Sequence, residues 1–314
     1  MQSKQNPITQ ISSNLTGNYE LDAKYLIAQH EIYKSHEDYE KISRSIRALM
    51  YNLIPKDKIL EFKKAVNQNN FIEKALLKVE TQLQKNDFNE ALKIIEPLIA
   101  EVERICKVSI DDDINEFHNF DSFFEEQIYM EIFRPVKKVR QMPWRCALAY
   151  LKYGAILFEL KKNDEAKNFL EKANKLNPVN TDILFELSEI YKMKDWNEYL
   201  RINNKCLEYA YSSRAIARCY RNYGFYFIEQ SDYETAIALY YLSLYFDQNS
   251  KAAEKELLYI SQKTGKNIKP PKFAEIEEML KQHNMQLGPN KLIVDLAFSL
   301  SKDMPNNDLI ALFT

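Results

Sequence analysis

The chain has 314 residues, of which 46% are apolar and 28% are charged, so it can bury a sizeable core and is not globally disordered. Only 5 of these residues are glycine, although about 7% is usual. Phosphate-binding loops, tight hairpins and Rossmann turns all need glycine, so the composition excludes doubly wound nucleotide-binding enzymes and β-sandwiches. The net charge of −2 argues against nucleic acid as a partner.

The cysteines and the apolar segments indicate where the protein resides. No two of the four cysteines form a CxxC pair, which is typical of a reducing cytoplasm. The N-terminal residues contain no apolar stretch of signal-peptide length. The most apolar late segment, LIVDLAFSL, is interrupted by Asp295 and is too short to span a bilayer. We therefore expect a cytoplasmic protein that has no membrane partner.

The first third of the chain has weak helical periodicity. Residues 1–18 are predicted to be a disordered tail. Apolar residues at helical spacing then predict one degenerate helix pair over residues 23–56, an extra helix over 57–69 and a second degenerate pair over 72–105.

Residues 107–146 interrupt this helical pattern. Residues 111–131 include many acidic side chains and no Lys or Arg, whereas 132–145 include basic side chains and no acid, with aromatic residues throughout. One interpretation is an acidic and aromatic binding insert. The favoured one is a long connection whose two halves pair with each other and whose rings are buried against the rest of the protein. Two prolines predict that 134–144 is partly extended.

A clear repeat follows at residues 147–180. Aromatic, small and apolar residues recur at fixed positions of this 34-residue window, and a proline ends its second helix. The residues that carry the pattern are Tyr150, Tyr153, Gly154, Leu157, Ala166, Leu170, Ala173 and Pro178. This segment resembles the tetratricopeptide repeat, whose glycine and alanine are small because two helices cross closely there.

A second copy supports the resemblance. Residues 217–250 repeat the pattern in phase, with Gly224 and Ala236 at the small positions, and the intervening 181–216 is a degenerate copy. The alternative is an irregular helical bundle, which the agreement in phase disfavours. The whole chain also resembles tetratricopeptide proteins of Firmicute bacteria.

Downstream, the helical pattern continues as one more degenerate pair and a tail. Residues 251–264 form a helix ended near Gly265 within the degenerate unit 251–284, and further helices are expected at about 272–284 and 290–301. Residues 285–314 are thus a C-terminal helical extension, and 308–314 begin a helix, so we expect the natural chain to continue. The prediction is an all-α fold: a TPR-like right-handed α-solenoid of about five to six helix pairs over residues 19–284.

No catalytic or metal-binding motif emerges. None of the four histidines stands four residues from another, so no helical metal pair exists. The sequence contains neither a GxSxG motif nor a Walker loop. We expect no enzyme activity, no cofactor and no metal.

The resemblance implies a peptide groove on the concave side, which the first helix of each repeat lines. One end of this groove is apolar and the other is charged, and Arg214, Arg218 and Arg221 form a stripe on one helix face. Alternatively, Asp182 and Glu189 of the previous repeat neutralise these arginines. The candidate groove residues are Leu148, Leu151, Phe158, Asp182, Phe185, Glu189, Arg214, Arg218, Arg221 and Phe225.

These features favour a non-catalytic scaffold or adaptor that binds a protein or peptide segment in the groove. The family's carboxylate clamp for chaperone tails needs paired Lys and Asn, and only Asn222 is present, so that ligand is disfavoured. The second hypothesis is a peptide-responsive intracellular regulator of the Gram-positive quorum-sensing type. Such regulators usually carry an N-terminal effector domain, and residues 1–70 contain no basic recognition helix.

Overall fold

The computed structural model describes residues 7–50 apart from 18, 34–35, 37, 40–41, 44 and 47–48, together with residues 59–106, 111–142 and 145–302. The helix expected at 308–314 lies outside these residues. The chain divides into two compact units, Met1–Phe71 and Ile72–Thr314. The degenerate pair predicted over 23–56 lies within the first of these units, and the units are described separately below.

The N-terminal unit contains the helices α1 (Pro7–Ser13) and α2 (Tyr19–Ile32). The buried Asp22 of α2 accepts hydrogen bonds from the backbone N–H of Thr16 (2.7 Å) and of Gly17 (2.7 Å). These donors, the Thr16 amide first, lower the pKa of Asp22. Ile11 of α1 is buried with apolar side chains from later in the unit, so part of the predicted disordered tail is instead helical.

The helix α4 (Ile59–Gln84) joins two predicted elements. The extra helix expected over 57–69 and the first helix of the 72–105 pair are one continuous helix, because no glycine or proline interrupts the sequence there. From Ile72 onwards its apolar side chains Ile72, Leu76 and Val79 are buried in the core of the second unit.

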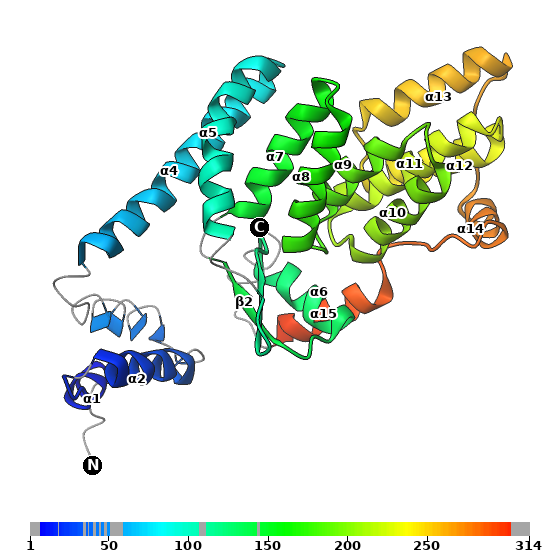
Figure 1. Cartoon of the computed structure of the whole chain (residues 1–314). Coiled ribbons are helices and arrows are strands. Elements are labelled where there is room, and N and C mark those ends of the chain that lie inside the picture. Colours follow the sequence, from blue (N-terminus) through cyan, green and yellow to red (C-terminus); the bar gives the residue numbers. More distant parts are fainter. Residues whose placement is uncertain are drawn as a thin grey trace. The chain divides into compact units, whose positions relative to one another are not determined.

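The helices of the second unit pack in adjacent pairs as a TPR-like α-solenoid (Figure 1). The two clear repeats are the pairs α7–α8 and α11–α12, and the degenerate copy is the pair α9–α10. In chain order the helices are α5 (Phe88–Cys106), α7 (Cys146–Glu159), α8 (Asn163–Leu176), α9 (Thr181–Tyr191), α10 (Trp196–Tyr209), α11 (Ser213–Glu229), α12 (Tyr233–Phe246) and α13 (Lys251–Thr264). No helix in the described part of the chain is long and apolar enough to cross a bilayer.

The two repeat glycines lie where paired helices approach most closely. A Cβ atom on Gly154 would lie 2.6 Å from Leu170 Cγ, and one on Gly224 would lie 2.8 Å from Tyr240 Cε2. Real Cβ atoms do not come this close to other atoms, so any side chain at either position would force the Leu170 or Tyr240 side chain to move. The predicted close crossing at both positions is confirmed.

The insert, residues 107–146, contains a short parallel sheet that we did not predict. Strand β1 (Asn115–His118) pairs with β2 (Lys138–Gln141), and helix α6 (Phe123–Phe133) connects them. The extended conformation expected for part of 134–144 is present at 138–141, as the paired strand β2. An all-α expectation missed the sheet because four-residue strands leave almost no periodic signal.

The two halves of the insert do contact each other. Arg145 of the basic half forms an ion pair with Asp121 of the acidic half (3.1 Å), and Lys137 donates to the carbonyl of Asp112 (2.6 Å). Phe124 is buried, whereas Phe133 stays 43% exposed. The favoured interpretation is thus confirmed for the pairing and for part of the aromatic set.

Beyond the last clear repeat, the predicted degenerate unit 251–284 and the C-terminal extension pack against earlier helices. Helix α13 ends at Gly265, whose φ of 68° is the left-handed conformation that favours glycine. After α14 (Phe273–Gln282), the chain passes the Tyr220 hydroxyl, which donates to the carbonyl of Gln286 (3.1 Å). Helix α15 (Lys291–Lys302) then lies beside α6 (Figure 1).

We expect Gly154→Leu and Gly224→Leu each to destabilise the protein by about 1–3 kcal/mol, because the new side chain must push the paired helix away. Thermal unfolding followed by circular dichroism measures this. Asn168→Leu on the exposed face of α8 is the matched control and should change the melting temperature little. Unchanged melting of both glycine variants would contradict the close crossing.

Candidate functional site

A cavity of about 600 Å³ lies between α6, α9 and α11. We call it the arginine cavity. Its charged lining comes from three elements that are distant in sequence: acidic side chains at the start of α6 and of α9, and basic side chains along α11. These residues are Asp121, Glu125, Asp182, Arg214, Arg218 and Arg221.

The predicted arginine stripe lies along this cavity. Arg218 forms an ion pair with Glu186 (3.4 Å), and its guanidinium lies 4.4 Å from the ring centre of Phe185. Arg221 forms an ion pair with Asp247 (3.4 Å). The prediction that Asp182 and Glu189 would neutralise the stripe was wrong, because the side chain that faces Arg218 from α9 is that of Glu186, one turn along the helix.

The positive charges of the stripe are crowded. Partial burial lowers the pKa of Arg221, and repulsion by Arg218 and Arg214 lowers it further, while Asp247 opposes both effects. Burial also raises the pKa of Glu186, and the positive charge of Arg218 opposes this rise. The three arginines thus place positive charges close together on the α11 side of the cavity.

A second cavity of about 280 Å³ adjoins the first and shares Arg218 and Arg221 with it. Here the Nζ atom of Lys192 lies 4.1 Å from the ring centre of Phe225 and 3.3 Å from a carboxylate oxygen of Glu189. The two cavities together extend from α6 across α9 and α11 to α13. An extended ligand would contact all of these elements.

The remaining predicted groove residues lie elsewhere or serve the fold. Leu148, Leu151 and Phe158 of α7 are half-buried against the core and do not line either of these two cavities. Phe185 is only 1% exposed, so its ring packs beneath the Arg218 guanidinium and belongs to the core. The side-chain amide of Asn222 donates to Asn203 (3.1 Å), so this amide is already engaged within the fold.

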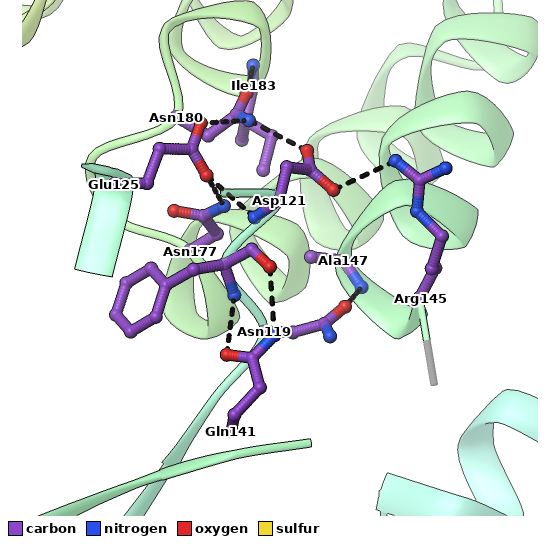
Figure 2. A network of polar contacts seen from close by, with 10 residues as sticks. Asn119, Asp121, Glu125, Gln141, Arg145, Ala147, Asn177, Asn180 and Ile183 are labelled. Atoms are coloured by element: carbon purple, nitrogen blue, oxygen red, sulfur yellow. Dashed lines mark hydrogen bonds and ion pairs between the residues drawn. The ribbon is translucent and has the colours of Figure 1, made fainter. Parts of the chain in front are cut away.

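The groove residues predicted from the sequence include none from the insert, whose Glu125 anchors it to the solenoid (Figure 2). The buried Glu125 carboxylate accepts hydrogen bonds from Asn177 Nδ2 (2.7 Å), Asn180 Nδ2 (2.9 Å) and the backbone N–H of Asp121 (2.8 Å). The Asn180 side chain also caps α9 by accepting from the backbone N–H of Ile183 (3.1 Å). The same group of residues thus fixes the insert and the start of α9.

Further polar contacts complete the attachment (Figure 2). The Asn119 side chain accepts from the backbone N–H of Ala147 (2.9 Å) at the start of α7, and its own backbone N–H donates to the carbonyl of Leu176 (2.9 Å). Gln141 holds Phe120 through a pair of hydrogen bonds, 3.1 and 2.8 Å. The insert therefore forms a fixed wall of the arginine cavity.

Burial raises the pKa of Glu125 to about 7, and the nearby Asp121 carboxylate adds to the rise, although the amide donors oppose it. A carboxyl group that titrates near neutrality makes the attachment of the insert sensitive to pH.

The described residues offer no metal centre, since no group of three His, Cys, Asp or Glu side chains could hold an ion. His118 lies in the insert, with Nδ1 at 3.2 Å from the carbonyl of Leu176. His283 lies 3.2 Å from the Thr235 hydroxyl and 4.0 Å from Asp232. Both rings have local partners, and these contacts belong to the packing of the insert and of α14.

Comparison with known families identifies residues 147–180, the pair α7–α8, as a tetratricopeptide repeat. A comparison with curated proteins found no match. The chain therefore contains a tetratricopeptide repeat, a unit that generally serves protein interaction.

The protein should lose about 3 kcal/mol of unfolding free energy between pH 4.5 and about 7 through Glu125. The pKa of Glu125 is higher in the folded than in the unfolded protein, so the folded state holds the proton more tightly and unfolding becomes easier as the pH rises through this window. Urea unfolding across this range should show this dependence reduced in Glu125→Gln. It should persist in the matched control Glu126→Gln, and equal dependence in all three proteins would contradict the assignment.

We expect Arg218→Ala and Arg221→Ala to cost about 1 kcal/mol of stability or less each, because both ion pairs are long and partly exposed to solvent. The comparison variant is Arg201→Ala, which removes an exposed ion pair with Glu198 on α10. A loss of several kcal/mol in denaturant unfolding, confined to the two stripe variants, would make these arginines structural.

Proposed function

We propose that this chain is a non-catalytic scaffold that binds a protein or peptide segment in the groove along α9 and α11. The observation that carries the proposal is the pair of adjoining cavities, joined by Arg218 and Arg221, on the first helices of successive repeats. Solenoids bind extended ligands on such faces because every repeat presents an equivalent helix to the same side.

The groove combines anchors of the kind that peptide sites use. Arginine forks bind carboxylates and backbone carbonyls, and half-buried aromatic rings such as Phe225 provide apolar contact. The insert closes one side of the groove, so a bound segment would meet a preformed surface there. Preformed surfaces lower the entropic cost of binding.

We place this scaffold in the cytoplasm, without nucleic acid or membrane as partner. The net charge of −2 supports the absence of a nucleic-acid partner. All four cysteines are free, including the buried Cys146, Cys206 and Cys219, which is consistent with a reducing compartment.

One observation favours the alternative, a peptide-responsive regulator of the Gram-positive quorum-sensing type. Residues Met1–Phe71 form a compact unit of their own, as an effector domain would. The nature of the natural ligand separates the two functions. A small secreted peptide recovered with the chain supports the regulator, and a cytoplasmic protein supports the scaffold.

Short peptides selected from a random display library against the whole chain should bind the groove. Bound peptides should slow hydrogen exchange of the α9 and α11 amides, and Phe225→Ala should weaken them because it removes an aromatic contact in the second cavity. The matched control is Phe169→Ala on α8, where a half-buried ring also lies beneath a lysine, Lys172 at 4.5 Å. If bound peptides slow hydrogen exchange in other helices instead, or if both variants weaken peptide binding equally, the groove is not the binding site.

A further inference from the structure

The charged groups of the arginine cavity fall into two classes. Arg218, Arg221 and Asp121 each have an ion-pair partner, and Glu125 has its three hydrogen-bond donors. Arg214 and Asp182 remain. Both line the cavity and both are exposed, yet neither forms an ion pair with the other or with any residue that the structure describes.

The position of Arg214 is unfavourable for the fold. It lies in the first turn of α11, after the cap Ser212, where the helix dipole disfavours a cation. It also precedes Arg218 by four residues on the same face, a spacing at which like charges destabilise a helix. A glutamate here would suit the helix better, so the arginine is not explained by local stability.

The opposite wall of the cavity is acidic. Asp182 lies in the first turn of α9, and Asp121 lies beside it through a hydrogen bond from Asn180 (3.0 Å). The cavity therefore has a basic wall on α11 and an acidic wall on α9 and the insert, and on each wall one charged group has no ion-pair partner among the described residues.

We infer that the arginine cavity binds a peptide segment that carries one acidic and one basic side chain. The acidic side chain lies against Arg214 and Arg218, and the basic side chain lies against Asp182. This inference rests on the proposed function and adds the chemistry of the ligand to it. A segment with both charges supplies the partner that each wall lacks.

Other anions fit the cavity less well. A phosphate group carries about two negative charges and would be repelled by Asp121 and Asp182 across the cavity. A single carboxylate matches the planar guanidinium fork and adds only one charge. The volume, about 600 Å³, also suits a few residues of a peptide better than a single ion.

The test uses end-capped, fluorescein-labelled peptides and fluorescence anisotropy with the whole chain. The probes hold one Glu and one Lys at a range of spacings in an otherwise Leu, Ala and Ser sequence, and companion peptides replace Glu, Lys or both by Gln. The best two-charge probe should bind about tenfold more tightly than either one-charge companion. A probe with phosphoserine in place of Glu should bind more weakly than the Glu probe.

Two variants assign the charges to their walls. Arg214→Gln should remove the preference for Glu but keep that for Lys, and Asp182→Asn should do the opposite. Matched controls are Arg201→Gln on α10 and Asp164→Asn in the first turn of α8, which should keep both preferences.

Three results would overturn the inference: equal binding of all four probe types, tighter binding of phosphoserine, or a uniform loss of all probes in both variants. If the display peptides still protect α9 and α11 while no charge preference is found, the groove function stands and only the ligand chemistry is wrong. If no peptide protects these helices, the proposed function fails first.

Discussion

The close crossing of paired helices at glycine is the constraint from which the rest of the second unit follows. With no side chain at Gly154 or Gly224, α7 lies directly on Leu170 of α8, and α11 lies directly on Tyr240 of α12. Each tight pair then stacks on the next through its buried apolar faces, as in other repeat solenoids. This stacking places α9 and α11 side by side, and so it brings the arginines of α11 opposite the carboxylates of α9.

The insert depends on that stacking and completes the cavity through polar contacts. Desolvation of Glu125 is costly, and three donors from Asn177, Asn180 and Asp121 are needed to compensate it. Such a network is directional, so it specifies one position for the insert where apolar packing alone would tolerate several. The hydrogen bonds to Glu125 therefore fix the position of the insert, which forms the wall of the cavity that faces α11.

The repeat register could be predicted from the sequence because it is a local property: a glycine, an alanine and a proline at set spacings require one packing of two helices. The position of the insert could not be predicted in this way, because the hydrogen bonds that anchor it join residues such as Glu125 and Asn180, more than fifty positions apart. The prediction of which carboxylates pair with the arginines of α11 was wrong for a related reason. Asp182, Glu186 and Glu189 lie within two turns of α9, and only the rotation of α9 against α11 decides that Glu186 meets Arg218.

Several residues whose positions are unfavourable for local stability lie close together. An arginine in the first turn of a helix, three like charges along one face, and a carboxylate buried with a raised pKa are each unfavourable alone. They occur together around a single cavity, although the helices that line it, α6, α9 and α11, have favourable side-chain caps at Ser122, Asn180 and Ser212. Proteins tolerate such local conflicts chiefly where function needs them. Among the residues that the structure describes, Arg214 and Asp182 thus have no ion-pair partner in this cavity, which is the arrangement that a ligand of opposite charges would resolve.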